Sequence, residues 1–304
     1  MDLVRASEEF KVKSISCPEF PILVNKDGEI VMHALDFMIY HCLKRGRVQS
    51  EGSWRTYGQD IYDFFSFCEA NNIDWCQIEY RQDETLLAVY RDVSMKQFGV
   101  SASTINRRLR FLIKFYNYAY NHKWVQTLPY QLETVIVRKP RGFLAHTDTS
   151  GGVKASPDVI VKQPRTKIKL LNREQVNQVL TSINNKTLKL MVKLGVLTGL
   201  RKAEILTFPL SYIVNPNSCN TRSHFKVDLN PNEMRIKGNE PRSIMVPVSL
   251  MSDLWDYSLH ERSGLIKGQD KPTDRLFVTR DGKAWSLKSK SFNNQLDSLG
   301  LDYK

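Results

Sequence analysis

Residues 198–205, which read TGLRKAEI, have the types and spacing that suit phosphate chemistry. An apolar helix ends at Gly199, and Arg201 begins a new turn with Glu204 three residues later, so both side chains lie on one helix face. A guanidinium can donate to two oxygens of one phosphate at once, which an ammonium group cannot do. Taken alone, the pattern is more often an ordinary Arg–Glu pair on a helix.

A lysine at a turn forms the second motif. Residues 235–242 read RIKGNEPR, and we predict that strands over 234–236 and 243–248 bracket this turn. Lys237, beside Gly238, would be mobile enough to give a proton to a backbone oxygen of DNA. Taken alone, such a lysine is more often a plain solvent-exposed hairpin residue.

Together and in this order, the two motifs resemble the catalytic domain of tyrosine recombinases, the phage-integrase-type enzymes that cut and rejoin DNA. That family shows TGLRxxEL at its first catalytic arginine and a GKGxKxR hairpin downstream. The resemblance implies catalytic roles for Arg201, Glu204 and Lys237. Arg242, which precedes Val246-Pro247, resembles the end of the family's hairpin.

The chemistry of that family needs no metal or cofactor, so the resemblance implies none for this chain. Its arginines hold the scissile phosphate and neutralise the charge of the pentacoordinate transition state. A tyrosine attacks to form a 3′-phosphotyrosine, and the hairpin lysine protonates the leaving 5′ oxygen. An HxxR motif and a further His or Trp complete the catalytic set.

The sequence departs from the family after the hairpin. His260 is the only histidine beyond Lys237, and His260-Glu261-Arg262 lacks the HxxR spacing. The only tyrosine beyond it is Tyr303, next to the last residue, where a nucleophile has no fixed position. We therefore expect the chain to bind DNA without cutting it. It would be either a truncated piece of an active integrase or a natural inactive relative. The first is favoured, because an intact catalytic set has no purpose in a pure binder.

The elements that position these residues are expected to form a mainly α, two-domain protein. The resemblance implies a helical, SAM-like core-binding N-domain and an α+β catalytic domain with a small antiparallel sheet, incomplete at its C-terminus. We place an N-terminal extended segment at 1–30, the helical domain at 31–137, a basic linker at 138–168 and the partial catalytic domain at 169–304.

Helical periodicity and capping residues support this order. In the first half we predict four helices, over 31–44, from a Ser50 or Ser53 cap to 68, over 83–98 and from a Ser101 or Ser103 cap to 120. No strand is predicted beyond an extended start at 20–24. In the second half, Asn172 and Gln175 have the spacing of a capping box. Further helices are expected over 187–198, 201–206, 250–259 and 289–299, with a short strand at 275–278.

Positive charge is concentrated in the middle of the chain. Residues 101–204 contain 19 Lys and Arg against 5 Asp and Glu, an excess larger than the net charge of +12 of the whole chain. Clustered charge of this kind indicates a surface for DNA phosphates, although part of it can be a plain solvated helix face. The expected DNA contacts are Thr104, Asn106, Arg107, Arg108, Arg110, Lys114, Arg138, Lys139, Arg141, Arg165, Lys167, Lys169 and Arg242.

The implied partner is duplex DNA at a specific recombination site, which the two domains would embrace as a clamp. Family members form tetramers there, and this chain is expected to be monomeric in solution. The absence of a signal core or of an apolar run near the roughly 18 residues of a membrane span favours a cytoplasmic, prokaryotic protein. Five cysteines without CxxC spacing favour free thiols over a metal site. Two other classes stay open, a non-catalytic DNA-binding regulator and a basic protein scaffold whose binding would ignore salt.

Overall fold

A computed structural model describes residues 1–45, 51–77, 84–137, 152–163, 170–218, 223–287 and 290–298. The chain divides into two compact units, Met1–Thr166 (unit 1) and Lys167–Lys304 (unit 2). Each unit has its own hydrophobic core. Within the described residues, no helix is long and apolar enough to cross a membrane. The described cysteines Cys17, Cys42, Cys68 and Cys76 are free thiols, as the sequence predicts.

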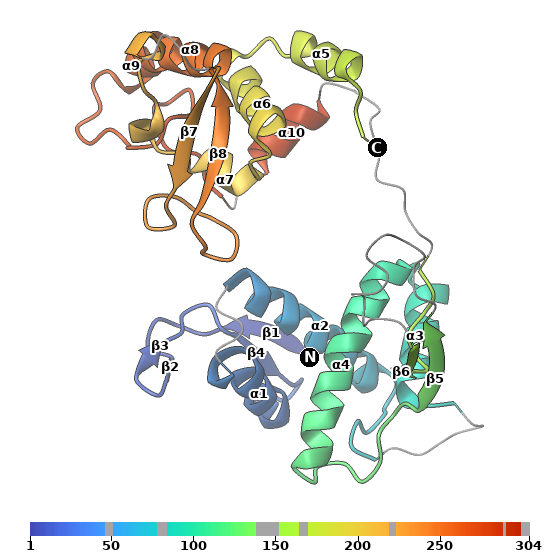
Figure 1. Cartoon of the computed structure of the whole chain (residues 1–304). Coiled ribbons are helices and arrows are strands. Elements are labelled where there is room, and N and C mark those ends of the chain that lie inside the picture. Colours follow the sequence, from blue (N-terminus) through green and yellow to red (C-terminus); the bar gives the residue numbers. More distant parts are fainter. Residues whose placement is uncertain are drawn as a thin grey trace. The chain divides into compact units, whose positions relative to one another are not determined.

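Helices dominate unit 1, as predicted from the periodicity (Figure 1). They are α1 (Met32–Met38), its π-helical continuation η1 (Ile39–Lys44), α2 (Glu51–Ala70), α3 (Leu86–Lys96) and α4 (Ala102–Asn121). Ser101 caps α4, because its hydroxyl accepts the backbone N–H of Thr104 at 3.3 Å. Thr85 caps α3 in the same way through the N–H of Ala88.

The core of unit 1 follows from the spacing of apolar residues along α4. Ile105, Leu109, Leu112 and Tyr116 recur every three or four residues and are all fully buried. They pack with Phe64 of α2 and the other buried aromatic rings of this unit. Burial of each such side chain contributes about 1.5–3 kcal/mol, so this one face fixes α4 firmly against its neighbours.

Strands also occur in unit 1. One of them, Pro21–Val24, lies where an extended start was predicted at 20–24, whereas Leu132–Val137 corrects the prediction that the domain at 31–137 is helical without strands. The described part of unit 1 has three antiparallel pairs: β1 (Asp2–Arg5) with β4 (Pro21–Val24), β2 (Lys11–Val12) with β3 (Ile15–Ser16), and β5 (Leu132–Val137) with β6 (Gly152–Pro157). Residues 152–163 fall inside the expected linker at 138–168, yet they form β6 and the segment that follows it within unit 1. Glycines and basic residues around β6 give this stretch the composition of a linker, which concealed its pairing with β5.

Unit 2 contains the helices predicted for the second half. They are α5 (Arg173–Ser182), α6 (Lys186–Thr198), α7 (Lys202–Leu206), α8 (Val248–Tyr257), α9 (Ser263–Ile266) and α10 (Ser291–Asp297), with short turns η2 (Leu210–Tyr212), η3 (Pro216–Ser218) and η4 (Ser258–Arg262). The capping box at the start of α5 is confirmed, since Asn172 and Gln175 each accept the other's backbone N–H.

The hairpin of unit 2 differs from the predicted one. Its strands are β7 (His224–Leu229) and β8 (Arg242–Pro247), paired so that Leu229 faces Arg242. The predicted strand at 234–236 is wrong, because these residues lie in the connection between β7 and β8. Met234 and Ile236 are nevertheless buried, so their apolar character anchors the connection instead of forming a ladder. The strand predicted at 275–278 is reduced to isolated bridges of Arg275 to Pro209 and Val278 to Ala284.

Candidate functional site

A left-handed glycine places Arg201 at the start of a new helix. Helix α6 ends at Gly199, whose φ of +70° is a conformation that favours glycine, and whose N–H donates to the carbonyl of Gly195 at 2.9 Å. The chain then turns at Leu200, which is buried, and α7 begins with Arg201 as its N-cap residue. The sequence therefore produces a tight turn between α6 and α7, which fixes the backbone of Arg201.

Glu204 is the centre of an arginine–carboxylate cluster, formed by Arg201, Glu204 and Arg242. Its side chain is 1% exposed. One carboxylate oxygen, Oε2, accepts the backbone N–H of Arg201 at 2.8 Å and Nη2 of Arg242 at 2.7 Å. The other oxygen, Oε1, accepts Nη1 of Arg201 at 3.3 Å. The carboxylate is thus held on both oxygens by two guanidinium groups from separate elements.

The electrostatics of this cluster favour an anionic ligand. Two guanidinium groups and one carboxylate leave a net positive charge, and the cationic side chains reach the surface, with 53% exposure for Arg201 and 36% for Arg242. Burial of an unpaired carboxylate costs several kcal/mol, which the arginine hydrogen bonds offset. The buried acid therefore fixes the orientation of two cations. Nε of Arg242 is buried, and the N–H groups of both arginines that reach the surface can donate to two oxygens of an oxyanion such as phosphate.

Lys237 stands at the exposed tip of the connection between β7 and β8. The turn at this tip depends on Gly238, with φ of +88°, and on Asn239, with φ of +58°. The described contacts do not join Lys237 to the arginine–carboxylate cluster. Its connection does end at Arg242, so the same segment carries both the lysine and one arginine of the cluster.

The other side of this connection is fastened to the end of α7. The hydroxyl of Thr207, the residue that follows α7, accepts the backbone N–H of Arg235 at 2.9 Å. Arg275 adds a bridge, because its Nη1 donates to the carbonyls of Thr207 at 2.7 Å and Glu233 at 2.6 Å. Both ends of the lysine-bearing connection are therefore bonded to α7 or to Thr207, the residue that follows it. Sequence reasoning missed Thr207 and Arg275, whose roles rest on contacts far apart in the chain.

The residues expected to contact DNA from α4 have three different environments. Arg110 and Lys114 are exposed, and Thr104 is half-buried beside the Ser101 cap. Arg107 and Arg108 reach α2, where they bind the carboxylates of Asp60 and Asp63.

Asn106 is buried, although we expected it to read DNA bases. Its amide nitrogen donates to the carbonyl of Val161 at 2.7 Å, and its oxygen accepts the Val161 N–H at 2.9 Å. Asn106 thus ties the segment after β6 to α4, and we leave it out of the proposed interface. The expected contacts Arg138, Lys139, Arg141, Arg165, Lys167 and Lys169 lie outside the described residues.

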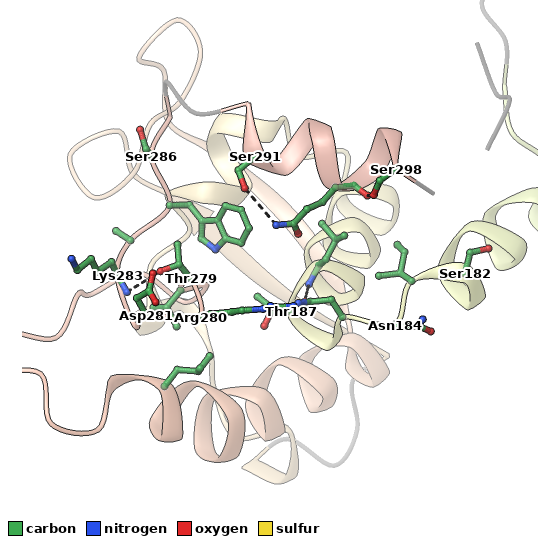
Figure 2. A pocket seen from close by; sticks show the side chains of 18 residues that line it. Ser182, Asn184, Thr187, Thr279, Arg280, Asp281, Lys283, Ser286, Ser291 and Ser298 are labelled. Atoms are coloured by element: carbon green, nitrogen blue, oxygen red, sulfur yellow. Dashed lines mark hydrogen bonds between the residues drawn. The ribbon is translucent and has the colours of Figure 1, made fainter. Parts of the chain in front are cut away.

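A separate pocket of about 760 Å³ opens in unit 2, between the start of α6, the segment 278–286 and α10 (Figure 2). Its lining is rich in hydroxyl and amide groups, and Figure 2 shows Ser291 bonded to a neighbouring glutamine of α10. Arg280, Asp281 and Lys283 line it as well. Of the expected catalytic and DNA-binding residues that the structure describes, none lines this pocket, so it is distinct from the arginine–carboxylate cluster.

Comparisons with known proteins identify a similar N-terminal domain and a similar fold. Residues 39–123 match the family described as phage integrase, N-terminal SAM-like domain, a range that runs from η1 to just beyond α4. Lambda integrase bound to DNA resembles the structure with a TM-score of 0.54 at 11% identity, over 88% of this chain and 79% of that one. The Tn1549 transposon integrase in complex with circular intermediate DNA gives 0.51 at 15% identity, over 88% and 78%. The chain therefore has a region similar to the phage integrase SAM-like domain at 39–123, and its fold resembles that of these two integrases.

A particular relative is found among transposases. Transposase A from transposon Tn554 of Staphylococcus aureus is 32% identical to this chain over 127 residues. The match covers 41% of this chain and 34% of the transposase, so it spans about a third of the length of that relative. The likeness connects the chain to a protein of a mobile genetic element.

Proposed function

We propose that this chain is a DNA-binding component of a tyrosine-recombinase system, which holds a phosphate of duplex DNA between Arg201 and Arg242. The observation that carries the proposal is the buried carboxylate of Glu204, which orients both guanidinium groups and leaves them half-exposed. Relatedness to a transposase and likeness to DNA-bound integrases support a recombination site of a mobile element as the substrate.

Each group of the site has a role in this proposal. Arg201 and Arg242 donate to non-bridging oxygens of one DNA phosphate and offset its negative charge. Glu204 holds the two arginines in place. Lys237, at the tip of its turn, would reach a backbone oxygen of the duplex. It would protonate that oxygen only where a nucleophile breaks the bond between the oxygen and phosphorus. Exposed Arg110 and Lys114 of α4 would contact neighbouring phosphates, which fix the register of unit 1 on the duplex.

Binding and cleavage are separate parts of the proposal. Strand cleavage in this class uses an HxxR motif and a tyrosine nucleophile, and no residues beyond the β7–β8 hairpin match that pattern. We propose that these 304 residues bind DNA as a monomer without forming a covalent phosphotyrosine. A duplex with a nick beside the cleavage site, which prevents religation, would test this. A covalent protein–DNA complex would then appear as a slower band on a denaturing gel. A covalent product, mapped by mass spectrometry to a tyrosine, would refute this part while leaving DNA binding intact.

A salt series of DNA affinity tests the binding itself. The wild-type chain should bind a duplex with log K falling linearly with log salt concentration, as expected when Lys and Arg displace counterions. Arg201→Ala should weaken binding by about tenfold and reduce the salt slope by about one. Arg5→Ala is a matched control, because Arg5 also binds a glutamate and its side chain is 55% exposed, against 53% for Arg201.

The outcomes separate the candidate functions. Salt-independent binding would indicate a protein scaffold. Salt-dependent binding in which Arg201→Ala behaves like Arg5→Ala would indicate a DNA-binding regulator that does not use the arginine–carboxylate cluster. Either result would overturn the proposed role of Arg201.

A further inference from the structure

A second buried carboxylate holds arginines in unit 1. Asp60 of α2 has a side chain that is 1% exposed, and its Oδ2 accepts a hydrogen bond from Nη1 of Arg107 on α4. One turn further along α2, Asp63 accepts Nη1 of Arg108 at 2.6 Å and the hydroxyl of Tyr90 at 2.5 Å. Adjacent arginines of α4 are therefore each bound by an aspartate of α2.

The two arginines differ in what they present to solvent. The side chain of Arg108 is 15% exposed, whereas that of Arg107 is 45% exposed. Arg107 therefore runs from a buried acid to the surface, while Arg108 belongs mainly to the interior network. Along α4, Arg107, Arg110 and Lys114 are spaced by three and four residues, so they lie on one exposed face of the helix.

This arrangement repeats the relation found in unit 2. There, Glu204 is also 1% exposed and binds Arg201, which is 53% exposed. In both units a carboxylate without access to water holds one N–H of an arginine whose remaining N–H groups lie near or at the surface. A guanidinium held in this way loses less side-chain freedom when it binds a phosphate than a free surface arginine does.

Two effects of Asp60 on phosphate binding oppose each other. Its negative charge lowers the attraction of this part of α4 for DNA, because it neutralises a neighbouring cation. Its hydrogen bond fixes the guanidinium, which lowers the ordering cost of binding. Burial raises the pKa of Asp60, an effect that the nearby Arg107 and Arg108 counteract, so the carboxylate depends on its arginine partners.

We infer that Asp60 is a positioning residue for DNA binding, which holds Arg107 in the orientation that contacts a phosphate, and that this positioning outweighs the charge of the carboxylate. The inference rests on the proposed function, since it assumes that α4 faces DNA. It assigns Arg108 and Asp63 to the support of that contact. It also predicts that removal of a negative charge at Asp60 weakens the binding of a polyanion, which is opposite in sign to the electrostatic expectation.

A double-mutant cycle on the full chain tests this inference. Asp60→Asn, which removes the charge and keeps one acceptor oxygen, should weaken binding to a duplex by about three- to tenfold. In an Arg107→Ala background the same substitution should have no further effect. In an Arg110→Ala background it should keep its full effect, which makes Arg110 the matched control on the same face of α4.

The cycle excludes a merely structural role for Asp60. Thermal unfolding of each variant is measured first, and affinities are compared at a temperature where all variants are folded. An Asp60→Asn variant that melts earlier but binds as tightly as wild type, or more tightly, would overturn the inference. So would a loss of affinity that persists in the Arg107→Ala background.

A second substitution keeps the inference testable if Asp60→Asn does not fold. Arg107→Lys retains the charge and loses the guanidinium that can span a carboxylate and a phosphate. Most of the affinity lost in Arg107→Ala should also be lost in Arg107→Lys, and wild-type affinity would refute the inference. If the wild-type chain itself shows no salt-dependent DNA binding, the proposed function fails. If it binds and the cycle shows no coupling, only the role of Asp60 fails.

Discussion

Arg242 and Glu204 are joined by a hydrogen bond of 2.7 Å, although 38 positions separate them in the sequence. Arg242 is the first residue of β8, and Glu204 lies in the middle of α7. The bond therefore fastens the hairpin to the helix that Arg201 caps. Because Glu204 binds Arg201 as well, one buried carboxylate determines where both cations lie relative to each other.

Arg242 and Arg201 are expected to contribute differently to stability. Arg242→Ala would leave a buried carboxylate without its shorter guanidinium bond and remove one link between β8 and α7. This should cost unit 2 about 1–3 kcal/mol after allowance for the partial exposure of Arg242. Arg201→Ala should cost less than about 1 kcal/mol, because the backbone N–H of residue 201 still donates to the carboxylate of Glu204. Hydrogen exchange of peptides from unit 2 across a urea series measures both values. Equal losses in the two variants would contradict this division.

Asn106 is expected to stabilise unit 1. Asn106→Ala removes two hydrogen bonds to the backbone of Val161 and leaves the N–H and the carbonyl of this half-buried residue without their partner. The loss should be about 2–4 kcal/mol, and the amide of Val161 should exchange faster. Asn117→Ala is the control, because Asn117 is exposed and accepts a single bond from the hydroxyl of Tyr130. DNA affinity measured below the melting range should not change in Asn106→Ala, since the side chain is enclosed in the fold.

His41 is expected to make unit 1 sensitive to acid. Burial lowers the pKa of His41 to about 4, assisted by the positive charges of Lys114 and Arg45. An unfolded chain has a histidine pKa of about 6.5. Between about pH 6.5 and 4, His41 is therefore protonated in the unfolded state and neutral in the folded state. Stability should therefore be constant above about pH 6.5 and fall by at most about 3 kcal/mol as the pH drops to about 4.

A substitution distinguishes the contribution of His41 to the pH dependence of stability from that of carboxylates that titrate in the same pH range. His41→Gln should flatten the pH dependence of unfolding between about pH 6.5 and 5, while the wild-type chain loses stability there. His224→Gln is the control, because His224 lies exposed at the start of β7. Identical slopes for wild type and His41→Gln would show that another group is responsible.

The sequence predicted most helices and the central pair of the site, because these depend on neighbours in the chain. Asn172 and Gln175 signal a cap three residues apart, and Arg201 and Glu204 face each other for the same reason. The alternation of Phe225, Val227 and Leu229 indicates β7. The strand was instead predicted at 234–236, because Met234 and Ile236 are apolar, and these residues are buried in the connection.

The polar networks could not be predicted in the same way. Arg107 and Asp60 are 47 positions apart, and Asn106 and Val161 are 55 apart, so no local pattern connects them. Counting Arg and Lys on α4 treated every charge as free, whereas the carboxylates of α2 engage two of them. Which cations remain for DNA depends on how the helices pack, and the hydrophobic periodicity leaves that undetermined.

Arg275 is expected to hold the lysine-bearing connection in place. Its Nη1 donates to the carbonyls of Thr207 and Glu233, and these two bonds join the end of α7 to the segment that leads to Lys237. Arg275→Ala should remove both bonds and accelerate hydrogen exchange of the amides over 233–239 by about tenfold, which corresponds to about 1.4 kcal/mol of lost protection.

Arg235→Ala provides the matched control for Arg275→Ala, since Arg235 lies in the same connection and its side chain is exposed. Its backbone N–H, which binds the hydroxyl of Thr207, is retained in the variant. Exchange over 233–239 should therefore stay close to that of the wild type in Arg235→Ala and rise only in Arg275→Ala. Unchanged protection in Arg275→Ala would mean that the buried Met234 and Ile236 hold the connection without help from Arg275.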